Sequence, residues 1–351
     1  MTAGARKLIV RLALSLAIAA AFVWWLGNQG LEILPSAGQF AAVAGWAVPV
    51  YLLTLVAVHF LRAYRWIYLL RPIHPGLAVR RMLPVAFVGF LAILVLPLRT
   101  GEIARPYLIK GHAGVSMSAA LGTIAIERVV DGLLVSLWLT LCLFGIDPSR
   151  SPYVWPLRLL PLGLFLAALV FLLAFLWRAE AFVRLGRRLA APFSQRLADT
   201  VVHVLEGFGR GLAVLPNKLA LLQFLVASVA YWSINAVGVM LLARGCGLEL
   251  DLLGGVATMA VVAVGILLPS GPGFFGNFQA SVLVALELYL PAAAGGVTGR
   301  AAAFIFLLYL CQVGLTLLVG FGSLLAARVS LRGVFSSGLP QVATEDLADW
   351  S

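Results

Sequence analysis

Long apolar runs, separated by short charged or glycine-rich segments, recur along the whole chain. Six of these runs hold the roughly 20 apolar residues that an α-helix needs to cross the hydrocarbon core of a membrane. They cover residues 8–28, 40–61, 116–145, 154–177, 219–243 and 300–326. The pattern predicts an all-α, polytopic bundle of membrane helices with six full spans.

Two further apolar stretches are interrupted in the middle. The first lies near 82–115 and the second covers 252–290, and proline and glycine break them at 97–101 and at 269–273. Proline removes a helical hydrogen bond and glycine is a poor helix former, so neither continues a helix readily. Each stretch is predicted to be a re-entrant hairpin or a pair of short spans, and the residues leave both forms open.

Positive charge sets the predicted orientation. Seventeen of the 25 Lys and Arg residues lie in four segments, namely the first 11 residues, 62–81, 178–218 and the residues just after the last run. Cationic loops stay on the cytoplasmic side, so these segments and both termini are predicted to be cytoplasmic. Segments 62–81 and 178–218 can lie on the same side of the membrane only if the first broken stretch enters the membrane and returns to the side from which it came.

The order of elements repeats within the chain. Residues 1–150 contain two runs, a broken stretch and a run, and residues 151–332 repeat that order before a short polar tail at 333–351. Each half crosses the membrane three times, which inverts the second half relative to the first. Inverted repeats with matching broken helices are typical of transporters whose substrate site lies near the midplane. The alternative is that proline and glycine only mark tight turns between short spans.

Residues 185–215 form a separate amphipathic segment. Leu and Phe recur at helical spacing along it, and a second stripe is polar. The polar stripe consists of Arg196, Asp199, His203, Glu206 and Arg210. We predict a cytoplasmic amphipathic helix that lies at the membrane interface or against the bundle. It is a surface-lying connector, or alternatively a gate or a docking surface.

Composition excludes a soluble protein. Hydrophobic residues make up 62% of the chain and charged residues 11%, whereas soluble domains contain about 25% charged residues. The net charge of +11 would suggest nucleic-acid binding in a soluble chain. Here the cations lie mostly between apolar runs, where they meet anionic lipid headgroups. We therefore expect a membrane lipid as partner and no nucleic acid, and a homo-oligomer remains possible.

The chain shows no motif of familiar soluble chemistry. Its four histidines are scattered without zinc-site spacing, and its three cysteines are far apart. It has no Walker A loop, no G-x-S-x-G elbow and no G-x-G-x-x-G turn. We expect no cofactor, no metal and no enzymatic activity. Any transport would use an ion gradient, lipid mass action or passive scrambling.

Three charged residues lie inside the third apolar run, at Glu127, Arg128 and Asp131. A charge at the centre of a membrane helix costs a few kcal/mol, so it normally faces protein or water and has a partner. Arg128 and Asp131 stand three residues apart and can pair, which would leave Glu127 to face substrate or relay protons. The alternative is a structural ion pair that holds the bundle together.

The two breaks carry further polar candidates. Arg99, Glu102 and Arg105 cluster around the first break, where the start of a new helix would favour an anion and the two arginines could close on one phosphate. Alternatively, Arg105 extends to the cytoplasmic headgroups. The second break combines residues that allow close backbone approach with two neutral amides. These are Pro269, Gly271, Gly273, Asn277 and Gln279.

Several of these segments resemble one known family. Residues 97–105 resemble the P-x-R-x-G-E-x-x-R motif of the lysylphosphatidylglycerol synthase transmembrane-region family, also called flippase-like proteins. Residues 127–131 match its E-R-x-x-D motif, and residues 269–276 resemble its P-S-x-P-G-x-x-G turn. Residues 62–66 also resemble the arginine-tryptophan end of its second span. The similarity covers nearly the whole chain, although Gln279 stands where the family often has Glu.

The resemblance implies an integral membrane protein of lipid handling in the bacterial cytoplasmic membrane. Its leading implication is a flippase or transporter for a phospholipid-like, polyprenyl or hopanoid-type lipid, whose headgroup would bind between the two hairpins. No aminoacyltransferase domain follows residue 332, so we do not expect this chain to make lysyl-lipid itself. The alternatives are an accessory subunit of a lipid-synthesis complex and a membrane-embedded enzyme that modifies a lipid headgroup.

Overall fold

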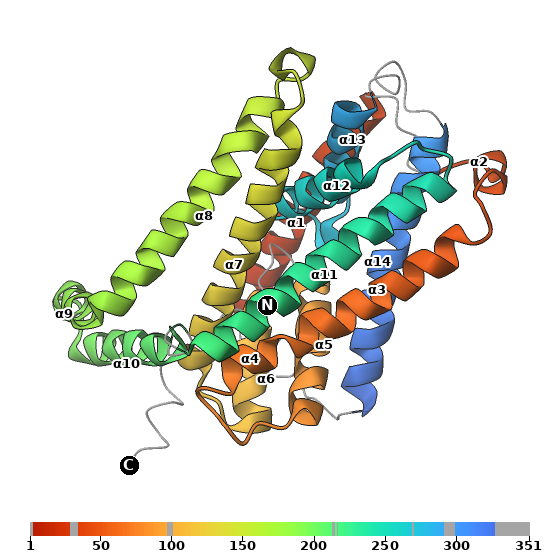
Figure 1. Ribbon diagram of the computed structural model, residues 1–351. Helices are drawn as coiled ribbons and strands as arrows, with labels where there is room; N and C mark the ends of the chain where they lie inside the picture. The colour runs from red at the N-terminus through yellow and green to blue at the C-terminus, as the bar shows by residue number, and fades with distance from the viewer. Residues whose placement is uncertain are drawn as a thin grey trace.

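The computed structural model describes residues 3–28, 34–96, 101–212, 215, 217–268, 270–290 and 299–326. Within these ranges the ordered elements are α-helices and short 3-10 turns, and no strand occurs (Figure 1). The predicted all-α class is therefore confirmed for the described part of the chain.

The long helices fall where the apolar runs predicted them. They are α1 (Ala3–Asn28), α3 (Ala47–Tyr64) with its continuation α4 (Trp66–Leu70), α7 (Met117–Phe144), α8 (Val154–Trp177), α11 (Lys218–Gly245) and α14 (Gly299–Ala326). Four of them, counting α3 and α4 together, are long and apolar enough to cross a membrane: α3–α4, α8, α11 and α14. Helix α7 is as long as α11 but carries the three charged residues. The count of six spans and the orientation of the termini stay predictions.

One boundary differs from the prediction. The run expected over 40–61 begins with a separate short helix, α2 (Ala37–Ala41), and the membrane helix α3 starts only at Ala47. Ser36 and Gln39 form a capping box at the start of α2, which satisfies backbone groups there and fixes that local turn. An apolar run thus marks the span but not the residue at which its helix begins.

Both interrupted stretches are helical hairpins. The first consists of α5 (Val79–Val95) and α6 (Ala104–Ala113), and the second of α12 (Leu252–Gly265), the 3-10 turn η4 (Pro272–Phe274) and α13 (Asn277–Tyr289). Within each hairpin the two helices pack against each other. The predicted helix breaks are confirmed, although residues 97–100 and 269 lie outside the described residues.

Glycines allow the close backbone approaches in these hairpins. A Cβ added at Gly101 would lie 2.1 Å from the carbonyl oxygen of Ala92, so only glycine lets the two arms meet there. In the second hairpin, Gly273 and Gly276 adopt positive φ angles of 71° and 85°. The second break is therefore a specific backbone turn, and in the first hairpin Gly101 allows the close approach of the two arms.

The two halves of the chain interleave. Helices α3 and α11 lie side by side and antiparallel, since a Cβ at Gly245 would meet the Cβ of Ala47 at 2.2 Å and one at Gly238 would meet Thr54 (Figure 1). The first arm of each hairpin then packs on the last long helix of the opposite half, α5 on α14 and α12 on α7. This reciprocal packing is the arrangement that an inverted repeat would give; the repeat itself stays a prediction.

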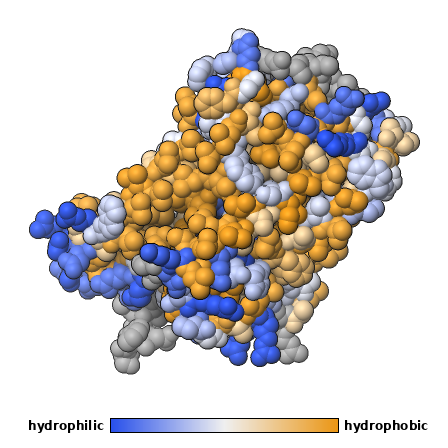
Figure 2. Space-filling view, in the orientation of Figure 1, coloured by the Kyte–Doolittle hydropathy of each residue, from blue (hydrophilic) through white to orange (hydrophobic). Residues whose placement is uncertain are grey.

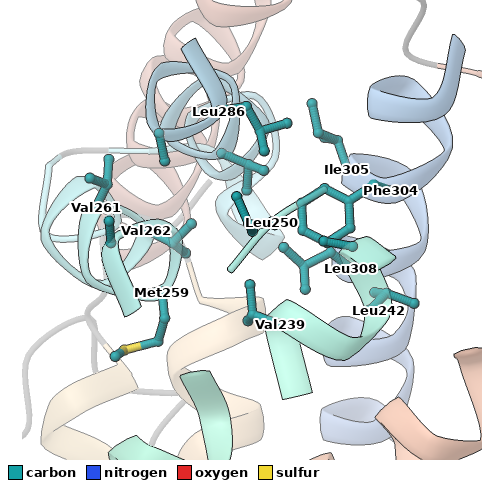
Figure 3. Close-up of a cluster of buried hydrophobic side chains, with 14 of the residues drawn as sticks. Val239, Leu242, Leu250, Met259, Val261, Val262, Leu286, Phe304, Ile305 and Leu308 are labelled. Carbon is teal, nitrogen blue, oxygen red and sulfur yellow. The ribbon is translucent and has the colours of Figure 1, made fainter. Parts of the chain in front are cut away.

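Apolar side chains fill the bundle and cover much of its outside. Figure 3 shows one part of the core, where Val239 and Leu242 of α11, Met259 and Val262 of α12 and Phe304 of α14 converge. Figure 2 shows a broad hydrophobic band across one face, with hydrophilic residues gathered toward its ends. Such an apolar exterior is expected for a protein that contacts lipid chains.

The predicted single amphipathic helix over 185–215 is wrong. The structure has two helices there, α9 (Ala179–Ala190) and α10 (Gln195–Gly211), which pack on each other, while α10 also packs on α7 (Figure 1). Pro192 disfavours a continuing helix, and the Ser194 side chain accepts a hydrogen bond from the Leu197 N–H to start α10. Because the apolar spacing continues through this turn, periodicity alone does not detect the break.

Candidate functional site

Five charged side chains from three segments meet inside the bundle. We call Arg65, Arg105, Glu127, Arg128 and Asp131 the charge cluster. Glu127, Arg128 and Asp131 come from α7, Arg105 comes from α6, and Arg65 lies between α3 and α4. All but Arg128 are buried. A buried charge needs a partner, so the pairing within this cluster decides what each residue can do.

Asp131 pairs with Arg65. The two guanidinium Nη atoms donate to the two carboxylate oxygens, each at 2.5 Å. Ser228 also accepts from Arg65, at 2.7 Å, and the indole N–H of Trp232 donates to Asp131 at 3.0 Å. The expected Arg128–Asp131 pair is therefore corrected, because Asp131 is held by groups from α3–α4 and α11.

Glu127 is enclosed by arginines. Arg105 donates to both of its oxygens at 2.9 and 3.1 Å, and Arg128 donates to one of them at 2.9 Å. The carboxylate is 0% exposed. The expectation that Glu127 remains free to face substrate is corrected, since three protein hydrogen bonds already occupy it.

The Arg105 side chain extends to the cluster between tightly packed neighbours. Its guanidinium lies 4.2 Å from the centroid of the Trp66 ring, and its stem crosses Gly89, where an added Cβ would lie 2.0 Å from the Arg105 Cγ. The side chain is 1% exposed. Neither alternative considered for Arg105 fits this position, because it reaches neither the lipid headgroups nor an open anion site.

Beside the cluster lies a cavity of about 450 Å³. Helices from both halves line it, including α3, α5 and α7 from the first and α8, α11, α12 and α14 from the second. Its charged wall consists of Arg62, Glu102, Arg128 and Asp131, and its neutral polar residues are His59, Ser136, Asn235, Thr258, Gln312 and Thr316. Apolar side chains make up most of the remaining wall.

Residues from both breaks reach this cavity. Glu102 follows the first break, and Gly273 with Phe274 belongs to the second; all three line the cavity. Four of the residues predicted for the site from sequence thus lie on one surface. They are Glu102, Arg128, Asp131 and Gly273.

Other predicted site residues hold the breaks in shape. Asn277 donates to the Gly265 carbonyl at 2.7 Å, and Gln279 accepts from the Gly276 N–H at 2.8 Å. A Cβ at Gly271 would lie 2.6 Å from the Cβ of Ala19, so this glycine allows α1 to approach. Arg99 and Pro269 lie outside the described residues.

Sequence reasoning missed Arg62 and Arg65 as site residues. Both end the second apolar run, where their charge was interpreted only as a topology signal. Arg62 lies 4.2 Å from the centroid of the Phe90 ring and lines the cavity. The available signal was the resemblance of residues 62–66 to a family segment, which marked these positions without giving their partners.

The fold and the cavity together define a polytopic membrane protein with a polar chamber inside an apolar helix bundle. The chain belongs to the family described as "Lysylphosphatidylglycerol synthase TM region", whose sequence profile matches residues 12–320. This family makes it a membrane protein of lipid handling.

A curated relative is similar over much of the chain. It is named "Glycosyltransferase AglD" and comes from Haloferax volcanii, with 26% identity over 279 residues. The match covers 70% of this chain but only 43% of the relative, so the chain spans less than half of that protein's length. No solved structure matches this chain. In the described part of the chain, no three or more His, Cys, Asp and Glu side chains are grouped to hold a metal ion.

Proposed function

We propose that this protein is a lipid flippase or transporter of the cytoplasmic membrane. It moves a phosphate-bearing lipid between leaflets, and the lipid leaves chemically unchanged. The observation that carries the proposal is the cavity itself, which has a charged wall, neutral polar groups and apolar surface within one membrane bundle. A lipid needs these same three environments for its phosphate, its headgroup and its chains.

The charged wall favours an anion. Four arginines and three carboxylates make up the charge cluster and the charged cavity wall together, which leaves one positive charge in excess. Arg128 has a cavity-lining side chain that is 27% exposed, unlike the buried Arg65 and Arg105. A phosphate would form charge-assisted hydrogen bonds with Arg128 and Arg62.

The position of α8 favours sideways entry of a lipid from the bilayer into the cavity. Leu164 and Phe165 of α8 line the cavity, and Leu164 is 63% exposed. Its neighbours Leu160 and Phe171 are exposed as well, and α8 packs mainly against α7. Because these apolar side chains of α8 are exposed and two residues of the same helix line the cavity, α8 offers acyl or prenyl chains an apolar route between cavity and bilayer.

Lipid movement in proteoliposomes tests this proposal. Purified protein should speed the exchange of fluorescent phosphatidylglycerol between leaflets relative to protein-free vesicles, and Arg128→Ala should slow that exchange about tenfold through loss of a charge-assisted hydrogen bond. The matched control is Arg187→Ala, because Arg187 forms an exposed pair with Asp199 away from the cavity. Wild-type protein that moves no tested anionic lipid would overturn the proposal.

The relative's name supports a second candidate function. A match to a protein named a glycosyltransferase favours a membrane component that holds a lipid substrate for headgroup modification, as an enzyme or as an accessory subunit. Mass spectrometry of the lipids after the same assay separates the two candidates. A chemically altered lipid would favour modification, whereas redistribution without a new product would favour transport.

A further inference from the structure

Five polar atoms in the cavity wall have no hydrogen-bond partner among the described residues: two are nitrogens, Nδ1 of His59 and Nε of Arg128, and three are uncharged oxygens. The oxygens are Oγ of Ser136 on α7, Oγ1 of Thr258 on α12 and Oδ1 of Asn235 on α11. Ser136 is 1% exposed and Thr258 is 0% exposed. Buried polar groups are nearly always paired, so three unpaired oxygens around a single cavity require an explanation.

The two hydroxyls differ from others in the same bundle. Ser and Thr on membrane helices commonly donate to a backbone carbonyl of the preceding turn. Thr123, Ser228 and Ser281 do so, with distances of 2.8 Å each to the carbonyls of Ala120, Phe224 and Asn277. Ser136 and Thr258 lack this bond, so their donors and acceptors remain available to a group in the cavity.

The helix packing brings these groups toward one region of the cavity. Helix α12 packs on α7 and on α11, and an added Cβ at Gly255 would lie 2.8 Å from the Ala236 carbonyl. Thr258 is one turn beyond Gly255, and Asn235 is next to Ala236. On α7, Ser136 stands two turns beyond Arg128, which is about 12 Å along the axis. Ser136 therefore lies apart from Arg128, while Asn235 and Thr258 lie on two helices that pack against each other.

We propose that Ser136, Asn235 and Thr258 form a neutral headgroup subsite that selects a lipid with a polyol headgroup, either glycerol or a sugar. This inference rests on the proposed function and specifies its substrate class. The phosphate binds at Arg128, and the hydroxyls beyond it donate to and accept from the three unpaired groups. An ammonium headgroup would find no carboxylate among these three side chains, and a bare phosphate would leave them unpaired.

A headgroup comparison tests the subsite. Vesicles carry fluorescent phosphatidylglycerol, a polyprenyl-phosphate hexose, phosphatidylethanolamine or phosphatidic acid, one at a time. Wild-type protein should move one or both polyol lipids faster than phosphatidic acid, and the faster of the two identifies glycerol or sugar. The Ser136→Ala/Thr258→Val double variant should lower the ratio of polyol-lipid to phosphatidic-acid movement about tenfold, because two hydrogen bonds are lost.

Thr54→Val is the matched control. Thr54 Oγ1 donates to the Tyr51 carbonyl at 2.7 Å and does not line the cavity, so this change should leave the headgroup ratio as in wild type. Folding is checked by thermal unfolding without added lipid. Removing unsatisfied hydroxyls should leave the double variant at least as stable as wild type, whereas loss of a structural contact would destabilise it.

Binding separates failure of the subsite from failure of the flippase proposal. Added phosphatidylglycerol or polyprenyl-phosphate hexose should raise the unfolding temperature of wild type more than phosphatidic acid does, and the double variant should lose that difference. If this holds without lipid movement, the subsite stands and the flippase proposal fails. If wild type treats all four headgroups alike, only water occupies these groups and the subsite proposal is overturned.

Discussion

Arg65 and Asp131 form a buried, bidentate ion pair within the charge cluster. Their two parallel hydrogen bonds join α3–α4 to α7, and Ser228 and Trp232 of α11 complete the network. Arg65 also lies 4.7 Å from the centroid of the Tyr231 ring. The pair therefore fixes α3–α4, α7 and α11 relative to one another at the edge of the cavity. The partly exposed charge of the cluster is that of Arg128.

Removing Arg65 should destabilise the fold strongly. Arg65→Ala leaves Asp131 buried without its ionic partner, which costs about 3–5 kcal/mol in soluble proteins. Arg65→Lys should fall between this variant and wild type, because an ammonium cannot reproduce the bidentate geometry. Thermal unfolding in detergent measures the effect. Arg187→Ala, at a pair exposed on both sides, serves as the control and should change stability by about 0–1 kcal/mol.

Glu127→Gln should also reduce stability. The amide offers one acceptor oxygen where Arg105 and Arg128 now share two, and its NH₂ group would face guanidinium donors. We expect a lower unfolding temperature, accompanied by reduced expression in the membrane. A carboxylate that faced open water or substrate would tolerate this change, so wild-type stability in Glu127→Gln would contradict the enclosed geometry.

The docking of α10 under α7 should depend on Gly122. A Cβ there would lie 2.4 Å from the Phe208 carbonyl oxygen and 2.8 Å from the Gly211 Cα, and backbone atoms cannot move aside cheaply. Gly122→Ala should therefore separate the two helices and lower the unfolding temperature. Gly209→Ala on α10 meets only the Phe175 ring, at 3.5 Å, and should be neutral or slightly stabilising. Equal losses in both variants would argue against this contact.

The predicted orientation can be measured by cysteine labelling. On a background with Cys142, Cys246 and Cys311 replaced, a cysteine at Ser149, between α7 and α8, should react with an impermeant maleimide in intact spheroplasts. A cysteine at Ser194, between α9 and α10, should react only after permeabilisation, because the cationic segment around it is predicted to be cytoplasmic. Strong labelling at Ser194 in sealed spheroplasts would invert the topology.

Helix positions were largely predictable from sequence because lipid imposes a simple rule. A membrane helix must stay apolar over about 20 residues, and α8 and α14 match the predicted runs 154–177 and 300–326 to within one residue. The break between α9 and α10 was not predicted, since a tight turn preserved the apolar spacing on both sides. The hairpin breaks were predicted because proline and glycine interrupt an otherwise uniform run.

Partners in the site were harder to predict than positions. Helical spacing places Arg128 within reach of Asp131, yet the actual partner Arg65 lies 66 residues away in sequence. Pairing across helices depends on how the helices cross, which a single sequence does not encode in its spacing. For the same reason, Asn277 and Gln279 could be recognised as polar residues at a break but not as supports of its backbone.

The interleaving of the two halves has a consequence for biosynthesis. Helix α5 packs on α14, whose first residue is made about 200 residues after α5 ends. Until the ribosome has delivered α14, the face of α5 that will meet it is left to lipid or to the insertion machinery. Contacts so distant in sequence form late and slowly. Assembly of the cavity therefore waits until residues 299–326 have been made, and chains that stop before residue 299 would lack one of its walls.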